Sequence, residues 1–198
     1  MQGASTGVCS CPVGTNGVHC ERVTGLFLGG SSGSSVIFNT VVAVLHSDHT
    51  AISIRFRTLY PNGVLVATDG PSDFLYVAIQ SSRLVTAFSL GAGTVRLLSY
   101  KGVSDGAWHT LVLNRTLNVA SMYIDGILDS FVVGPSTRTG LNAITRVLIG
   151  QSSSRQPLAP FIGLLSSAFV NGFDIFGDAF MGSNIRITPV YVSRLYFY

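Results

Sequence analysis

The chain has 198 residues, of which 47% are hydrophobic and only 11% are charged, and its formal net charge is +3. This length and hydrophobic content suit one main domain with a large core plus a short extra segment. The positive charge is too small and too dispersed to indicate nucleic-acid binding, and no apolar run is long enough to cross a bilayer. Helix-favouring glutamate and lysine occur once each, while β-branched and aromatic residues are plentiful, so the composition favours strands.

The first 23 residues form a segment of their own that holds all three cysteines, Cys9, Cys11 and Cys20. The pattern C-x-C, eight residues and C, with glycines nearby, resembles the last half of an epidermal-growth-factor-like (EGF-like) repeat. The resemblance implies a disulfide between Cys11 and Cys20, and it pairs Cys9 with a cysteine outside this sequence. Such disulfides are typical of extracellular proteins. Free thiols or a partial zinc site are the alternatives, although zinc requires four ligands and only His19 stands nearby.

Residues 1–8 lack the charged start and the long apolar stretch of a secretory signal peptide. Because an extracellular protein needs such a peptide, and because Cys9 has no partner, we expect the sequence to be a fragment of a longer modular protein. Residues 29–35, GGSSGSS, are small and flexible. They are expected to form a linker or a loop inside the first hairpin of the next domain.

From Val36 onward, short alternating segments are separated by turn residues. Ile52, Ile54 and Phe56 alternate with polar residues, which predicts a strand with one buried and one solvated face. Further strands are expected over 75–79, 84–90, 95–99, 110–114, 120–124 and 146–149. Turns are expected at Pro61–Gly63, Asp69–Gly70, Asp105–Gly106, Asp125–Gly126 and Asn171–Gly172. This rhythm predicts an all-β, two-sheet antiparallel sandwich, with one short helix plausible at 174–181.

Several strings in this stretch carry a resemblance when they are taken in order. They are ISIRFRT (52–58), GVL (63–65), DFLYV (73–77), DGAWHT (105–110), MYIDG (122–126), LIG (148–150) and FIG (161–163). Together they resemble a laminin G-like domain, over roughly residues 26–190. The resemblance implies a concanavalin-like jelly-roll sandwich of about a dozen or more strands. Residues 191–198 are then a C-terminal edge strand or a tail, and an EGF-like segment before such a domain is a familiar arrangement.

Trp108 is expected to bury its ring under a sheet edge, and His109 to begin the next strand, both as packing residues. A catalytic role for His109 would need a nucleophile or acid partner that the sequence does not place. The chain departs from the family at Leu164, where many members have a cysteine after the Phe-x-Gly string. No cysteine follows Cys20, so the sandwich must hold by packing alone.

Laminin G-like domains of the neurexin type bind calcium at the rim of the sandwich, through an aspartate, an asparagine and two backbone carbonyls. The resemblance places these ligands at Asp73, Asn142, Leu90 and Gly140. Calcium accepts hard oxygen ligands in loose geometry, and with a single carboxylate we expect a weak site, on the order of 0.1–1 mM, as in extracellular modules. The alternative is that Asp73 and Asn142 are ordinary turn residues.

Two further polar motifs stand apart from this set. Asn114-Arg115-Thr116 is an N-glycosylation sequon, and in a secreted protein Asn114 could carry a glycan on a hairpin, although so short a motif often arises by chance. His46, Asp48 and His49 could bind a transition metal. Because this run falls in the loop before a strand, we interpret it as loop polarity.

The sequence offers no recognisable catalytic constellation. Glycoside hydrolysis, the most plausible chemistry on this fold, needs a pair of carboxylates flanking the bond. The sole glutamate, Glu21, lies in the cysteine segment, and four of the eight aspartates stand beside glycine, as is typical of turns. There is no P-loop, and no cysteine is a plausible catalytic nucleophile. We therefore predict that the protein is not an enzyme.

Three functions fit these observations. The first is a calcium-assisted adhesion or receptor module that recognises a protein or glycan through its rim loops. The second is a calcium-independent module for sulfated, heparin-like glycans, which would use Arg96, Arg138 and Arg155. The third is a ligand-free structural spacer. Each of them places the chain outside the cell or at its surface, in a matrix or membrane-anchored parent protein.

Overall fold

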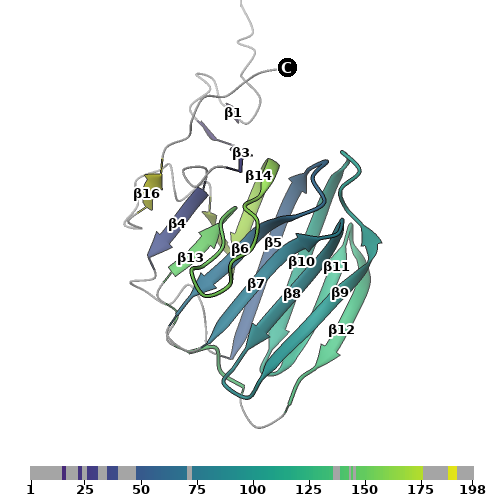
Figure 1. The fold of residues 1–198 in the computed structure, drawn as a ribbon, viewed down its shortest axis with the longest axis vertical. Coiled ribbons are helices and arrows are strands. Elements are labelled where there is room, and N and C mark those ends of the chain that lie inside the picture. Colours follow the sequence, from purple (N-terminus) through teal and green to yellow (C-terminus); the bar gives the residue numbers. More distant parts are fainter. Residues whose placement is uncertain are drawn as a thin grey trace, which may run out of the picture.

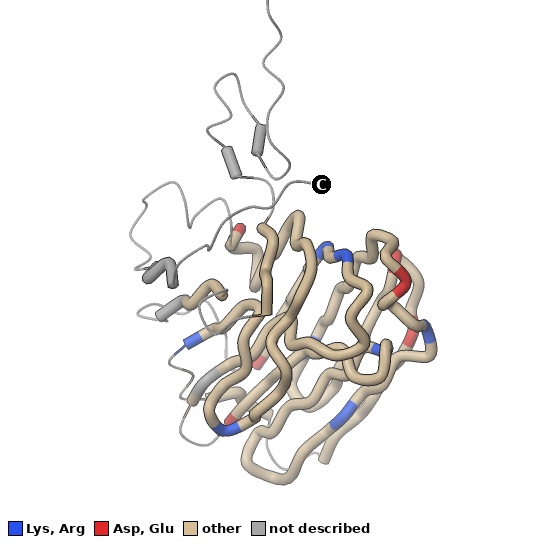
Figure 2. The backbone as a smooth tube through the Cα atoms, turned by 45° about the horizontal axis from the view of Figure 1, so that its top comes forward, with Lys and Arg blue, Asp and Glu red and all other residues tan. Residues whose placement is uncertain are grey.

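The computed structural model describes residues 15–16, 22–23, 26–30, 35–39, 48–70, 73–135, 139–142, 144, 146–175 and 187–190. These residues form a sandwich of two seven-stranded sheets with antiparallel pairing, and a separate two-stranded ladder lies near the N-terminus (Figure 1). The predicted all-β antiparallel sandwich is therefore confirmed. No helix in this part of the chain is long and apolar enough to cross a membrane. Charged residues are sparse and scattered over both sheets (Figure 2).

The first sheet has the strand order β12 (Ile127–Val133), β11 (Val119–Ile124), β10 (Trp108–Thr116), β5 (His49–Arg57), β14 (Ile162–Val170) and β15 (Phe173–Asp174), and β3 (Leu26–Gly29) also pairs with β14. The second sheet has the order β16 (Ile187–Val190), β4 (Ser35–Asn39), β13 (Arg146–Ile149), β6 (Gly63–Asp69), β7 (Phe74–Gln80), β8 (Arg83–Ser89) and β9 (Thr94–Gly102). The ladder pairs β1 (Thr15–Asn16) with β2 (Arg22–Val23).

The core lies between the two sheets and follows from the two-residue alternation of the strands. In β5, Ile52, Ile54 and Phe56 are each at most 1% exposed, as predicted. In β10, alternate residues also point inward, with Leu111 and Leu113 fully buried. Burying side chains of this size stabilises the sandwich by about 1.5–3 kcal/mol each. Packing of the two sheets therefore supplies the stability that the absent C-terminal disulfide does not.

The alternation also corrects the expected burial of Trp108. His109 shares the inward parity of Leu111 and is 3% exposed, so Trp108 falls on the outer face of the sheet. Its ring is half-buried there, with the guanidinium carbon of Arg55 4.8 Å from the ring centroid. The tryptophan thus makes a cation–π contact at the surface, and the histidine occupies the core.

Residues 29–35 do not join two strands of a hairpin. β3, on one side of them, pairs with β14 in the first sheet, whereas β4, on the other side, pairs with β13 and β16 in the second. The chain therefore crosses from one sheet to the other here, so both expected roles of this stretch, linker and hairpin loop, were wrong. The helix expected over 174–181 falls almost entirely outside the described residues, and its first residue, Asp174, ends β15.

On one side of the sandwich, a carboxylate links the edge strands of the two sheets. The β11–β12 pairing shifts between Met122 and Tyr123, which leaves Asp129 as an extra residue on β12. Asp129 accepts hydrogen bonds from the backbone N–H groups of Tyr100 (2.9 Å) and Lys101 (3.1 Å) on β9. Because β12 and β9 are edge strands of different sheets, this bulge ties the two edges together.

Candidate functional site

Asp73 and Asn142 meet at one rim of the sandwich. Asp73 directly precedes β7, and the pairing of Phe74 with Ser89 brings the end of β8, which Leu90 directly follows, beside it. The backbone N–H of Asn142 donates a hydrogen bond to Oδ2 of Asp73 at 2.8 Å. The structure thus brings together the start of β7, the end of β8 and the 139–142 segment, which together carry all four residues of the predicted calcium site.

The oxygen atoms at this rim fit a hard divalent cation. Asp73 is 5% exposed, and among the described residues its second carboxylate oxygen has no hydrogen-bond donor. Nδ2 of Asn142 donates to the carbonyl of Gly140 at 3.3 Å, so these two polar groups face each other across a single residue. A cation held by both would require the amide oxygen in place of the nitrogen. Carboxylate, amide and carbonyl oxygens are the ligands that calcium prefers.

Arg115 supports this rim from inside the sandwich, and the sequence interpretation missed it. Its side chain is 1% exposed, and Nη1 donates to the carbonyls of Leu117 (2.7 Å) and Thr139 (3.2 Å). Nη2 donates to Oγ1 of Thr50 at 3.0 Å. Burial lowers the pKa of Arg115, and the charge of Asp48 opposes this shift. The alternation of β10, which continues through Arg115, could have revealed its inward position.

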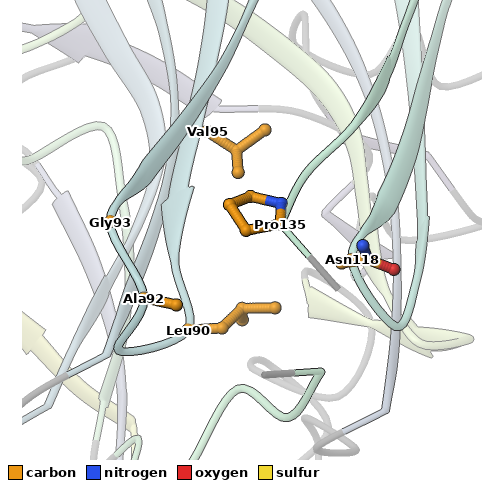
Figure 3. A pocket seen from close by; sticks show the side chains of 6 residues that line it. All are labelled: Leu90, Ala92, Gly93, Val95, Asn118 and Pro135. Atoms are coloured by element: carbon orange, nitrogen blue, oxygen red, sulfur yellow. The ribbon is translucent and has the colours of Figure 1, made fainter. Parts of the chain in front are cut away.

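A shallow pocket opens beside Leu90 on the same rim. Leu90, Ala92, Gly93, Val95, Asn118 and Pro135 line it (Figure 3). Asn118 fixes its far wall, because its Nδ2 donates to the Gly134 carbonyl at 2.6 Å while the Gly134 N–H donates to the Asn118 carbonyl at 2.8 Å. The cavity volume is only about 10 Å³, which is about the volume that one water molecule needs. This pocket is therefore too small to hold an organic ligand.

A second polar cluster lies at the other end of β10, around His109. Nδ1 of the imidazole is 2.9 Å from Oδ2 of Asp125, and Nε2 is 3.0 Å from Oδ1 of Asp105. Asp125 also accepts hydrogen bonds from Nζ of Lys101 at 2.5 Å and from the backbone N–H of Thr110 at 2.8 Å. With both ring nitrogens occupied, His109 is a structural residue here, as predicted.

The predicted arginine trio is spread over different parts of the chain. Arg96 is exposed on β9, Arg155 stands in the segment before β14, and Arg138 lies outside the described residues. Arg96 instead shares an open groove of about 460 Å³ with Arg83, Gln80, Val85 and Leu98. Its Nη2 donates to Oε1 of Gln80 at 3.2 Å. Among the described residues, neither Arg83 nor Arg96 forms an ion pair with a carboxylate.

The remaining sequence predictions fall at the surface or beyond the described part of the chain. Asn114 is exposed on β10, on the outer face of the first sheet. Asp48 and His49 are exposed at the end of the sandwich where β5 begins, with Nδ1 of His49 3.0 Å from Oδ1 of Asp48. His46 and the cysteines lie outside the described residues, so the disulfide between Cys11 and Cys20 stays a prediction.

The sequence profile of the Laminin G domain matches residues 56–173, which is more than half of the chain. The chain belongs to the Laminin G family. This family comprises binding modules rather than enzymes. The match confirms the laminin G part of the resemblance, while the EGF-like half-repeat remains a prediction.

Named relatives include large cadherins. The chain is 26% identical over 151 residues to protocadherin Fat 4 of Homo sapiens, a match that covers 65% of this chain and 3% of that protein. It is 28% identical over 178 residues to the Fat-like cadherin-related tumor suppressor homolog of Drosophila melanogaster, covering 86% of this chain and 4% of the fly protein. The chain therefore spans only a small part of the length of these relatives.

The fold has a solved counterpart in laminin itself. Domains LG4-5 of the mouse laminin alpha1 chain superpose with a TM-score of 0.69 at 19% identity, covering 86% of this chain and 47% of that one. At this identity the likeness establishes the fold alone. It agrees with the two seven-stranded sheets described above.

Proposed function

We propose that this Laminin G domain is an extracellular adhesion or receptor-binding module that binds calcium at its rim through Asp73, Asn142 and the carbonyls of Leu90 and Gly140. The observation that carries the proposal is the 2.8 Å hydrogen bond from the Asn142 N–H to Asp73. It joins residues 69 positions apart in the sequence, and it leaves one buried carboxylate without a cationic partner among the described residues. A rim with this composition attracts a divalent cation.

The bound ion would add positive charge where three loops meet and would make them stiffer. Because the site offers a single carboxylate, we expect a dissociation constant on the order of 0.1–1 mM, a range given for extracellular modules. Such a site fills only where calcium is abundant, which is outside the cell. The names of the relatives, two cadherins and a laminin chain, support the same location.

The partner in this proposal is a protein or a glycan that contacts the rim across its surface. The pocket beside Leu90 holds about 10 Å³, so recognition of a small molecule in a cavity has no support at this end. Loops carried on a rigid sandwich are a common way of presenting a binding surface. Contacts to the ion itself would suit an acidic group on the partner.

Thermal unfolding with calcium and with chelator tests the metal site. A ligand at ten times its dissociation constant stabilises the folded state by about 1.4 kcal/mol, which corresponds to a rise in melting temperature of about 3–5 °C for a domain of this size. The variant Asp73→Asn keeps an oxygen acceptor for the Asn142 N–H but removes the charge. We expect it to melt close to the parent in chelator and to lose the response to calcium.

Two more variants sharpen this test. Asn142→Asp supplies a second carboxylate, so it should lower the melting temperature in chelator through charge repulsion and enlarge the rise caused by calcium. Asp105→Asn removes an exposed carboxylate at the opposite end of the sandwich, beside His109, and should leave the calcium response intact. Equal calcium shifts in the parent, Asp73→Asn and Asn142→Asp would rule the site out.

The groove with Arg83 and Arg96 favours a second candidate function, the binding of a sulfated glycan without calcium. Two guanidinium groups with no carboxylate partner among the described residues suit sulfate or carboxylate groups. The polar side chain of Gln80 and the apolar surface of Leu98 can contact a sugar ring from the same groove. This arrangement uses only Arg96 of the three arginines that the sequence suggested.

Heparin-affinity chromatography at several salt concentrations tests the second candidate. Retention of the parent should fall steeply with salt, since each phosphate- or sulfate-type contact releases counterions. The double variant Arg83→Ser/Arg96→Ser should elute earlier, whereas Arg55→Ser, an exposed arginine of the other sheet, should change retention much less. Equal losses from all these arginines would indicate non-specific attraction, and no response to calcium or heparin would leave the structural spacer.

A further inference from the structure

The outer face of the first sheet exposes an unusual number of large apolar side chains. On β12, Leu128 is 53%, Phe131 59% and Val133 60% exposed, and Phe169 on β14 is 37% exposed. Tyr123 and Val112, on the strands between them, are half-buried on the same face. Contiguous apolar surface of this kind on an extracellular module is normally covered, because uncovered it promotes association.

The sequon Asn114-Arg115-Thr116 forms the last three residues of β10, an interior strand of this sheet. Asn114 and Thr116 are exposed, while Arg115 between them is 1% exposed and points into the sandwich. The sequon therefore presents its acceptor amide and its hydroxyl residue on one side of the sheet. Nothing on β10 has to move for a group attached to Nδ2 of Asn114 to lie in solvent.

The neighbours of Asn114 leave room for a bulky group. In the sheet register it stands between Ala51 of β5 and Ser121 of β11, and Ser121 is in turn opposite Phe131 of β12. The two residues beside the asparagine are thus small, and the aromatic ring of Phe131 stands two strands away, about 10 Å. The small residues next to Asn114 leave space for the first sugars, and the ring of Phe131 beyond them can contact the flat apolar face of a sugar ring.

We propose that Asn114 carries an N-linked glycan that lies over this outer face and covers its apolar side chains. In the attachment step, Nδ2 of Asn114 forms a bond to C1 of the first sugar of a lipid-pyrophosphate-linked oligosaccharide. The C1–oxygen bond to the pyrophosphate breaks, the amide nitrogen loses one proton, and the lipid pyrophosphate leaves. The proposal rests on the extracellular location in the proposed function, but not on the calcium site.

A consequence is that the outer face of the first sheet is not the surface that meets a partner. A hydrated glycan that lies over this face leaves the rim near Asp73 and the outer face of the second sheet for recognition. The other occupant of the apolar face, a second copy of this domain, is an outcome of the experiment below.

The test uses the chain secreted from mammalian cells, with three sequon variants. Asn114→Gln and Thr116→Val abolish the sequon, whereas Thr116→Ser retains it with the same exposed geometry. We expect the parent and Thr116→Ser to lose mass on treatment with an amidase that releases N-glycans, and the two other variants to show no change. An unmodified Asn114 in the secreted parent would overturn the proposal.

Covering of the face is measured with an apolar fluorescent dye and by gel filtration, after circular dichroism has shown that each variant folds. Asn114→Gln should bind more dye and elute as larger species than the glycosylated parent. Adding Phe131→Ser to Asn114→Gln should reverse both effects.

If the glycan is present but Asn114→Gln behaves like the parent, the glycan does not cover the face. If the glycosylated parent is itself a dimer that Phe131→Ser dissociates, a second copy occupies the face. The calcium response should be the same in all of these variants, so failure here is distinguishable from failure of the metal site.

Discussion

The two ends of the sandwich both contain a buried or half-buried polar group, but they differ in how completely it is satisfied. At the end that holds His109, each ring nitrogen has a carboxylate, and Asp125 further accepts hydrogen bonds from Lys101 and the Thr110 amide. At the opposite rim, Asp73 accepts one hydrogen bond, from a backbone N–H, and no cation pairs with it among the described residues. A polar cluster whose hydrogen-bonding groups all have partners is structural, whereas a buried carboxylate with an oxygen still free to accept is a place where a ligand can bind.

The comparison explains why the same residue types lead to different conclusions at the two ends. A histidine between two aspartates is a tempting metal or catalytic motif, yet its donors and acceptors already satisfy one another. A lone aspartate beside an asparagine is easily dismissed as turn chemistry, yet no cationic side chain among the described residues pairs with it. The inventory of hydrogen bonds therefore distinguishes the two ends better than the sequence motifs do.

The largest change in the free energy of unfolding is expected from His109→Ala, at the end of the sandwich where both ring nitrogens of this histidine have a carboxylate partner. The change opens a cavity in the core and removes a partner from Asp105 and Asp125, so we expect a loss of about 3 kcal/mol in the free energy of unfolding. Urea denaturation measures it, with Asp73→Asn in chelator as the matched control at the other end. The comparison fails if His109→Ala costs no more than that control.

A smaller loss is expected from Arg115→Met, which removes the donors beneath the calcium rim. Thr50 and the carbonyls of Leu117 and Thr139 lose their hydrogen bonds while most of the side-chain volume remains, so unfolding should become easier by about 2 kcal/mol. Because the 139–142 segment loses an anchor, calcium binding measured by calorimetry should also weaken. Arg115→Lys keeps the charge but not the planar fork, and an unchanged calcium affinity in both variants would show that Arg115 does not position the rim.

The smallest effect is a pH dependence at the end that holds His109. Burial would raise the pKa of Asp125, but hydrogen bonds from Lys101, the Thr110 amide and His109 outweigh it and lower the pKa to about 2. A lowered pKa in the folded state means that the stabilisation is complete above the ordinary value of 3.8 and is lost as the pH falls towards 2.

Asp125→Asn isolates this contribution without disturbing the turn. Asp125 and Gly126 both have positive φ, 53° and 82°, and asparagine tolerates this conformation well. Between pH 5 and pH 2 the parent should lose about 1 kcal/mol more stability than the variant, after allowance for the exposure of this carboxylate. Identical pH profiles in chemical denaturation would show that Asp125 does not contribute in this way.

The sequence predicted those strands in which the two-residue alternation runs without interruption, such as β5 and β10. It did not predict β6, β12 or β14 as separate strands, and each of these takes part in a pairing with a register shift, near Val64, Asp129 and Leu165 respectively. A bulge moves the following residues to the opposite face, so alternation breaks where the strand does not. The exposed apolar residues of β12 also hid this strand, because apolar residues on its outer face remove the apolar–polar alternation from the sequence.

The candidate site was predictable only through the family resemblance. Asp73 and Asn142 are 69 residues apart in the sequence, and no local periodicity brings them together. The inward position of Arg115 was predictable, because its parity in β10 matches that of Leu113, but the strand expected there ended at residue 114. Arg83 was overlooked as the neighbour of Arg96 because the β8–β9 register pairs these arginines with Gly102 and Ala87, and they meet only along the groove.

The extra residue on β12 has a consequence for how such domains coexist at high local density. The amides of Tyr100 and Lys101 on β9 are donors that an incoming strand from a neighbouring molecule could recruit, and Asp129 already occupies them. A competing strand would have to displace a carboxylate and leave its charge against the new backbone, which is unfavourable. A single misaligned residue thereby discourages edge-to-edge polymerisation along this side, without any change in the hydrophobic pattern of the core.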